Sequence, residues 1–362
     1  MPFALPAPTF RACNRQFMRA QDTQLRSRHI LALVWDFDKT LVPGYMQEPL
    51  FKAYGIDEGA FWTEVNQLPG YYAKKGIHVS KDTVYLNHLL SYVKNGPLKG
   101  LSNRRLRELG SEICFCPGLP DFLDAVRSFA REAGARLNLE ISLEHYIIST
   151  GIAEMIRGSK IAGSVDGVFG CEFIEQPLPP GFALQDEMPL ADSGEISQIG
   201  VMVDNTIKTR FIFEINKGTN KNAAIDVNAV VAASDRRVPF ENMIYIADGP
   251  SDVPVFSLVR KNGGLAYAVY NEEKESEFRQ NDQLQQTGRV DGYGPNDYRD
   301  NAFTPRWLRK RVEDRIDRIA REQEYVLDSR VARPPRHLHS GDELAARRNM
   351  PPAGPVQGTF PI

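Results

Sequence analysis

The sequence predicts an α/β fold: a Rossmann-like parallel sheet with helices on both faces, and a helical cap domain inserted after the first strand. Two short apolar runs, Ile30–Trp35 and Met243–Ala247, are rich in aliphatic residues, as strands covered on both faces are. Each run ends directly before an aspartate. Reactive groups in open α/β sheets lie where strands end and loops begin, so the same pattern also locates a candidate site.

The segment that follows the first strand is predicted to be helical. Within it, one helix face carries aliphatic residues three or four positions apart, namely Leu86, Leu89, Leu90 and Val93. After this segment, Pro117–Asp121 opens another helix that leads to a strand, His145–Ser149. The sheet therefore resumes after an insertion of helices.

The second half of the chain predicts further strands and helices. Residues 177–197 lack periodicity and predict an exposed loop. Two strands are expected at Gly200–Val203 and Arg210–Ile215, and a helix after Thr219. An amphipathic helix is expected from Pro305, because apolar residues recur there at helical spacing.

These elements predict four parts of the chain. The α/β core comprises residues 29–42 and 117–330, and the cap comprises residues 43–116. Residues 1–28 are expected to form a flexible arm. Residues 331–362 are rich in proline and are expected to be disordered, since they cannot bury enough apolar surface to offset the loss of chain entropy.

The composition favours a small molecule as the binding partner. The 362 residues include 44 Lys plus Arg against 46 Asp plus Glu, so a net charge of -2 gives no global attraction to nucleic acid or to an acidic membrane. The longest apolar run is far shorter than the roughly 20 residues that cross a bilayer. Four cysteines form no disulfide framework, which makes a cytoplasmic location the expectation.

Two short motifs carry groups suited to phosphate chemistry. Asp36 and Asp38 are two residues apart at a strand end, so both carboxylates can face one substrate. One can attack phosphorus while the other gives and takes a proton. The triplet Ser149-Thr150-Gly151 follows the next predicted strand and can offer hydroxyl and backbone donors to phosphate oxygens.

A cation and a metal site complete the pattern. An anionic nucleophile and an anionic phosphate about 4 Å apart repel by roughly 4 kcal/mol at an effective dielectric constant of about 20, so a lysine is needed. The candidates are Lys217 and Lys221. Asp248 and Asp252 follow the strand at Met243–Ala247, and such carboxylates suit Mg²⁺, which prefers oxygen ligands.

The four motifs, in this order, resemble the haloacid dehalogenase (HAD) superfamily, in particular its phosphatase branch with a helical cap, to which phosphoserine phosphatase belongs. The resemblance runs from about Ile30 to Tyr270. It implies that Asp36 forms an aspartyl-phosphate, that Asp38 is the general acid and base, and that Ser149 binds the phosphoryl group.

The resemblance also implies the remaining site residues. Lys221 is favoured over Lys217 as the catalytic lysine, because the family pattern has a lysine entering a helix. Substrate-binding residues are expected at Thr40, Thr150, Gly151 and Lys217. Mg²⁺ would be held by Asp36, the main-chain carbonyl of Asp38 and Asp248, with Asp252 in support.

The implied function is magnesium-dependent hydrolysis of a small phosphorylated metabolite. Phosphoserine phosphatases carry a cap glutamate where this sequence has about Tyr45, with Glu48 out of register, which argues against phosphoserine. Dehalogenation, phosphotransfer to another acceptor and a catalytically silent binding module are the alternatives. Aromatic residues of the cap either line a substrate pocket or pack between helices, namely Tyr45, Phe51, Tyr54, Phe61, Trp62, Tyr71 and Tyr72.

Overall fold

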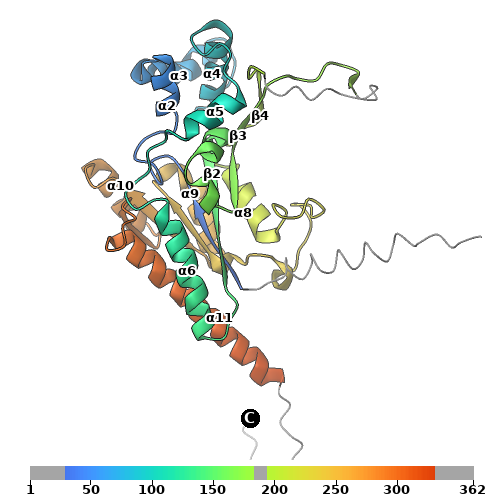
Figure 1. The fold of residues 1–362 in the computed structure, drawn as a ribbon, viewed down its shortest axis with the longest axis vertical. Coiled ribbons are helices and arrows are strands. Elements are labelled where there is room, and N and C mark those ends of the chain that lie inside the picture. The colour runs from blue at the N-terminus through green and yellow to red at the C-terminus, as the bar shows by residue number, and fades with distance from the viewer. Residues whose placement is uncertain (1–28, 183–193, 331–362) are drawn as a thin grey trace, which may run out of the picture. The chain divides into compact units, whose positions relative to one another are not determined.

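The computed structural model describes residues 29–182 and 194–330 (Figure 1). The predicted N-terminal arm, the predicted C-terminal tail and part of the predicted loop at 177–197 lie outside these residues. The described chain up to Ile319 forms one compact unit, and a second begins at Ala320, within the last helix. No helix in the described residues is long and apolar enough to span a bilayer.

A seven-stranded sheet organises the core, with strand order β4-β3-β2-β1-β5-β6-β7. All neighbouring strands are parallel except β3 and β4, which are antiparallel. The strands are β1 (Ile30–Trp35), β2 (Ser142–Ile152), β3 (Gly167–Ile174), β4 (Gln198–Val201), β5 (Met243–Ala247), β6 (Leu265–Tyr270) and β7 (Gly292–Pro295). The predicted Rossmann-like fold class is therefore confirmed.

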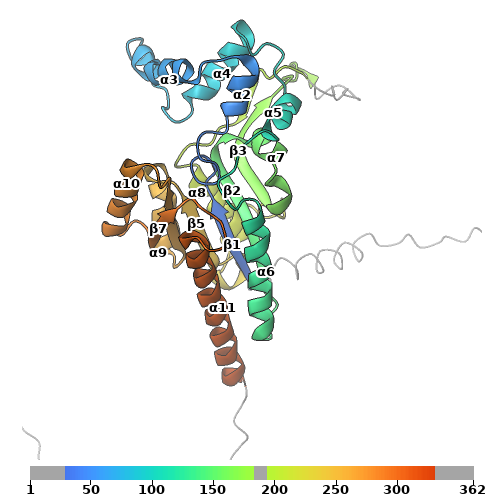
Figure 2. The ribbon, with the colours of Figure 1, turned by 60° about the vertical axis from the view of Figure 1, so that its left-hand side comes forward.

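Helices cover both faces of this sheet (Figures 1 and 2). Alternate residues of β1 point to opposite faces. The face of Ala32 and Val34 is packed with residues of α8 and α9. On the other face, Trp35 meets Phe122 of α6 edge-on, at a ring-centroid distance of 6.4 Å. The core helices are α6 (Asp121–Arg136), α7 (Ala153–Gly158), α8 (Lys208–Lys217), α9 (Val253–Lys261), α10 (Glu275–Gln286) and α11 (Phe303–Arg330).

Four helices inserted between β1 and α6 form the cap, as predicted (Figure 2). They are α2 (Glu48–Tyr54), α3 (Glu58–Ala73), α4 (Val84–Asn95) and α5 (Asn103–Gly110). On α4, the predicted apolar face is buried at Leu86, Leu89 and Val93. Because the insertion follows the strand that ends at Asp36, the cap is attached directly to the candidate site.

Two sequence predictions in the second half of the chain are wrong. The segment Arg210–Ile215 is not a strand but part of α8, in which Ile212 and Ile215 share the buried face. Its β-branched and aromatic residues favour a strand, but packing of that face on the sheet outweighs this local preference. The helix expected after Thr219 is replaced by turns, and Val230, one of its expected apolar residues, is fully exposed.

The cap joins the core through a close crossing of α5 and α7 that uses one glycine from each helix. A Cβ added to Gly158 of α7 would lie 1.8 Å from the main-chain oxygen of Arg107 in α5. Reciprocally, a Cβ added to Gly110 of α5 would lie 2.1 Å from the main-chain oxygen of Met155 in α7. Both obstacles are backbone atoms, so no rotamer change of a side chain relieves the clash.

We predict that Gly158→Ala lowers the free energy of unfolding by about 1–3 kcal/mol or more, because the helices must separate. Urea denaturation followed by circular dichroism measures the change. Gly163→Ala is the matched control, since a Cβ there meets no atom within 4 Å. Equal stability of Gly158→Ala and Gly163→Ala would contradict the close backbone contact between α5 and α7.

Candidate active site

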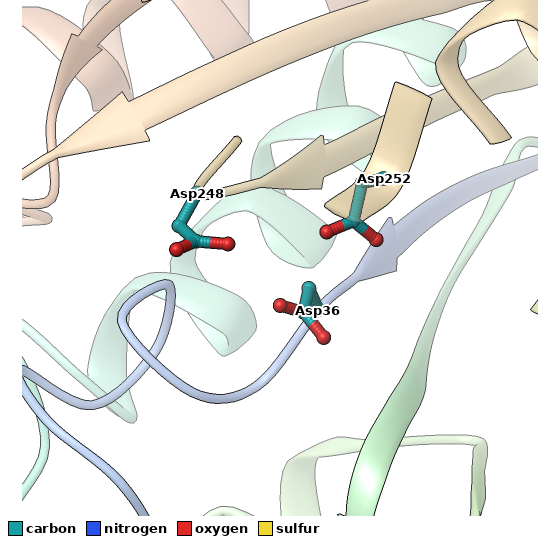
Figure 3. A group of neighbouring side chains, drawn as sticks. All are labelled: Asp36, Asp248 and Asp252. Atoms are coloured by element: carbon teal, nitrogen blue, oxygen red, sulfur yellow. The ribbon is translucent and has the colours of Figure 1, made fainter. Parts of the chain in front are cut away.

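Three aspartates from two neighbouring strands converge at one end of the sheet (Figure 3). The amide N–H of Asp36 donates to the carbonyl of Ile246 (2.8 Å), so β1 and β5 end side by side. Asp248 follows β5, and Asp252 lies just before α9. One carboxylate oxygen from each of these aspartates lies within 4.8 Å of the others. The structure therefore assembles the predicted first and fourth motifs.

The cation of this cluster is Lys208. Its Nζ lies 2.8 Å from Oδ1 of Asp36 and 2.8 Å from Oδ1 of Asp252, and the side chain is 1% exposed. The hydroxyl of Tyr245 also donates to Oδ1 of Asp252 (2.5 Å). Burial alone would lower the pKa of Lys208, but the charges of Asp252 and Asp36 outweigh it and raise the pKa. Lys208 is therefore a permanent cation beside Asp36.

Neither predicted lysine lies in this cluster, which corrects the prediction of Lys221 and its alternative Lys217. Lys221 is exposed, and its Nζ donates to the carbonyl of Asp166 (2.9 Å), just before β3 begins. Because β1 and β3 run in the same direction, Lys221 lies at the amino end of the strands, whereas Asp36 follows the carboxyl end of β1. Lys217 ends α8 and donates to the carbonyls of Val227 and Ala229.

The sequence does contain a signal for Lys208. Residues 208, 212 and 215 are spaced as i, i+4 and i+7, so they share one helix face, and Ile212 and Ile215 are fully buried. A lysine at the first position of a buried face needs buried anionic partners. The prediction of a strand from Arg210 concealed this spacing.

We predict that Lys208→Met lowers the free energy of unfolding at pH 8 by about 3–5 kcal/mol, because two buried carboxylates lose their counter-charge. The loss should shrink at pH 5, where the carboxylates can take up protons. Lys221→Met, the control, should change stability by about 1 kcal/mol or less. Chemical denaturation at both pH values measures the effect, and the reverse ranking of the two variants would refute this assignment.

Asp38 lies on the turn that leads into the cap. The turn is tight: Lys39 has a φ of 56°, in the left-handed region, and its N–H donates to the carbonyl of Gly44 (3.0 Å). Oδ1 of Asp38 accepts a hydrogen bond from the N–H of Met46 (2.7 Å). Burial and the nearby charge of Asp36 raise the pKa of Asp38 to about 7. Asp38 is thus able both to donate and to accept a proton near neutral pH.

The Ser149-Thr150-Gly151 triplet lies on β2, beside β1, where the pairing of β2 with β3 shifts register. Such bulges redirect side chains near active sites. Oγ of Ser149 accepts a hydrogen bond from the N–H of Gly151 (2.9 Å). A Cβ on Gly151 would lie 2.2 Å from the end of the Met46 side chain, so this flexible side chain of the cap turn would have to move to admit one.

Thr40, predicted to bind substrate, is buried in the turn after Asp38. Its main-chain carbonyl accepts a hydrogen bond from the hydroxyl of Tyr298 (2.8 Å). Its own Oγ1 has no hydrogen-bond partner among the described residues. A buried hydroxyl without a partner is uncommon in folded proteins, so its contact with substrate stays a prediction.

The acidic cluster fits a hard divalent cation. Burial and the charges of Asp36 and Asp252 raise the pKa of Asp248 to about 8, and within the described residues its carboxylate has no hydrogen-bond or ion-pair partner. Asp252, in contrast, already accepts hydrogen bonds from Lys208, Tyr245 and Ser251. Asp36 and Asp248 are therefore the better ligands, with Asp252 in the supporting role predicted for it. Ligation by the carbonyl of Asp38 stays a prediction.

We predict that Mg²⁺ stabilises the folded protein more at pH 8.5 than at pH 6. The pKa of Asp248 is above its unfolded value of 3.8, so the metal-free fold loses stability as pH rises from about 4 to about 8. Mg²⁺ binds only the deprotonated carboxylate and adds about 2.7 kcal/mol at about 100 times its Kd. Thermal unfolding with and without Mg²⁺ measures this.

Asp248→Asn tests which residue is responsible. This variant should unfold at a higher temperature than the wild type without Mg²⁺ at pH 8.5, and Mg²⁺ should no longer shift it. Glu273→Gln, which removes an exposed negative charge, should respond to Mg²⁺ like the wild type. An undiminished Mg²⁺ response of Asp248→Asn would rule out its role as a ligand.

A cavity of about 380 Å³ opens between this site and the cap. On the core side it is lined by Asp38, Thr150 and Gly151. The cap side includes Tyr45 and Trp62, which answers part of the question about the aromatic residues of the cap. Two other aromatic residues of the cap pack between helices instead: Phe51 and Phe61 are buried, with ring centroids 4.8 Å apart. Glu48 is exposed and does not line this cavity.

The parallel sheet, the helical cap inserted after its central strand β1 and the aspartates at the ends of β1 and β5 define a capped Rossmann-like α/β fold, as the sequence predicted. No protein-family model matches the chain. An uncharacterized protein of Borreliella burgdorferi is 40% identical over 232 residues, which cover 64% of this chain and 79% of that protein. The chain belongs to the same family as this Borreliella protein.

Two examples of solved structures with similarity to the chain are a hydrolase and a phosphatase. A HAD-family hydrolase of Salmonella enterica serovar Typhi has 14% identity and a TM-score of 0.42, with coverage of 74% of this chain and 72% of that one. A phosphoserine phosphatase without ligand has 15% identity and a TM-score of 0.41, with coverage of 75% and 96%.

Proposed function

We propose that this protein is a magnesium-dependent hydrolase of a small phosphomonoester and acts through an aspartyl-phosphate. One observation carries the proposal: Lys208 holds Asp36 beside Asp38, whose raised pKa suits proton transfer, and Asp38 lines a cavity large enough for a substrate. A nucleophile, a proton donor and a binding space are thus adjacent.

The first chemical step transfers the phosphoryl group to the protein. A carboxylate oxygen of Asp36 attacks phosphorus, and the bond between phosphorus and the alcohol oxygen breaks. Asp38 gives its proton to the departing oxygen, so the product leaves as a neutral alcohol. Lys208 offsets negative charge beside the attacking carboxylate throughout this step.

The second step releases phosphate. Asp38, now deprotonated, accepts a proton from a water molecule while the oxygen of that water attacks phosphorus. The bond between phosphorus and Asp36 breaks, which regenerates the carboxylate and frees inorganic phosphate. A pKa of about 7 places Asp38 where it can serve as acid in the first step and as base in the second. Bound Mg²⁺ would neutralise phosphate charge and orient the phosphoryl group against Asp36.

The presence of Asp38 favours phosphoryl transfer over displacement at carbon. An alkoxide that leaves phosphorus needs a proton, whereas a halide that leaves carbon does not. The hydrogen bond from the N–H of Met46 holds the carboxyl of Asp38, which lines the cap cavity where a leaving alcohol would lie. This contact connects the proton donor to the part of the protein that would bind the alcohol.

We predict that purified protein releases phosphate from phosphomonoesters only with Mg²⁺, and that Asp36→Asn abolishes the release. Asp38→Asn should lower kcat/KM about 10²–10⁴-fold for alkyl esters, because their alkoxides need a proton. Its effect on the first step with p-nitrophenyl phosphate should be much smaller, since nitrophenolate leaves without one. Burst kinetics measure this step separately.

The same phosphate-release assays can also contradict the proposed function. Release that persists in Asp36→Asn, or no release from any ester with Mg²⁺, would overturn the proposed function. Glu273→Gln is the control for an exposed acidic residue outside the site and should retain wild-type rates.

A further inference from the structure

The cap side of the cavity carries a continuous aromatic wall, which we define as Tyr45, Trp62 and Tyr85. The ring centroids of Tyr45 and Trp62 are 5.5 Å apart, and those of Trp62 and Tyr85 are 5.7 Å apart. All three residues line the cavity, and Tyr45 is 42% exposed although its side chain is large and aromatic. Exposed aromatic surface inside a pocket is surface that a ligand can cover.

The aromatic wall is held in place from the core side. The hydroxyl of Tyr85 donates to the main-chain carbonyl of Thr150 (2.7 Å), next to Ser149 on β2. The indole N–H of Trp62 donates to Glu58 within α3 (3.3 Å), so the polar edge of this ring is already satisfied. What Trp62 offers to the cavity is apolar ring surface.

A buried polar atom lies in the same cavity and has no partner. Gln47 is 2% exposed, lines the cavity, and its Oε1 has no hydrogen-bond partner among the described residues. Its neighbour Met46 binds Asp38, so Gln47 lies close to the proposed position of the leaving oxygen. An amide oxygen accepts hydrogen bonds, and a ligand O–H or N–H would satisfy it.

The charges of the cavity disfavour a small substrate with a carboxylate. Its lining contains no arginine, the residue best suited to bind a carboxylate through two parallel hydrogen bonds. The cationic Lys81 of the lining is adjacent in sequence to the acidic Asp82, which also lines the cavity. This lining thus carries one cationic residue, Lys81, against two acidic ones, Asp38 and Asp82.

We propose that the alcohol part of the substrate is a planar aromatic or heteroaromatic ring, with a hydrogen-bond donor a few bonds from the ester oxygen. The ring packs on the aromatic wall, and the donor binds Oε1 of Gln47. This inference rests on the proposed function and adds the substrate class to it.

The test compares esters whose leaving alcohols have similar reactivity. We expect kcat/KM for 2-phenylethyl phosphate to exceed that for 2-cyclohexylethyl phosphate by about ten-fold, because only the planar ring can stack. O-phospho-L-serine should be poorer than both. 2-Hydroxy-2-phenylethyl phosphate, which adds a donor, should in turn be several-fold better than 2-phenylethyl phosphate.

Single substitutions test which residue causes each substrate preference. Trp62→Leu and Tyr45→Leu should each bring the ratio of phenyl to cyclohexyl ester towards about 1, while hydrolysis of the cyclohexyl ester persists. Gln47→Leu should remove the advantage of the added hydroxyl but keep the preference for the ring. Tyr71→Leu is the matched control, because Tyr71 lies on α3 with Trp62 but is 53% exposed and outside the cavity lining.

The outcomes separate this inference from the proposed function. Hydrolysis of the cyclohexyl ester or of phosphoserine as fast as the phenyl ester would overturn the inference and leave the proposed function standing. A ring preference that survives both Trp62→Leu and Tyr45→Leu would also overturn it. If no ester, including p-nitrophenyl phosphate, releases phosphate with Mg²⁺, both fail together.

Discussion

The buried ion pairs of Lys208 with Asp36 and Asp252 are the interactions on which the candidate site depends. They join the first helical position of α8 to the end of β1 and to the turn before α9. Removal of such groups from water costs several kcal/mol for each ion, and their attraction only partly offsets this cost. The cluster is therefore poor evidence for stability and better evidence for function, because its three members would otherwise be replaceable by apolar residues.

The charge balance of the site explains why a cation and a proton donor both belong there. Asp36, Asp38, Asp248 and Asp252 outnumber the two nearby cations, the buried Lys208 and Lys39, whose charge acts on Asp38 and Asp248. Burial raises the pKa of Asp38 to about 7 and of Asp248 to about 8, so without a metal part of this negative charge is removed by protons. A divalent ion held by Asp36 and Asp248 would displace the proton of Asp248, and Asp38 would remain the group that exchanges a proton with the leaving oxygen.

The cap is connected to the core in two different ways. The α5–α7 crossing places backbone against backbone and leaves no room for a side chain at Gly110 or Gly158. The second connection consists of the hydrogen bonds from Met46 to Asp38 and from Tyr85 to Thr150, which are single contacts around the cavity. The cap is thus fixed to the core by a rigid crossing whose residues do not line the cavity, and by separable contacts beside the proton donor.

The sequence alone determined the strands that end in aspartates, because continuous apolar runs such as Ile30–Trp35 are unambiguous when both faces are buried. It also placed the cap and the acidic motifs, since chain order and strand ends fix where parallel strands present their loops. The tertiary structure identified the lysine, although the helical spacing of residues 208, 212 and 215 is a signal for it in the sequence. The local preference of residues 210–215 favours a strand, and only packing on the sheet makes them a helix that directs Lys208 towards Asp36. The cavity was likewise beyond the sequence, because whether Tyr45 and Trp62 pack inward or line a pocket depends on contacts between helices far apart in the chain.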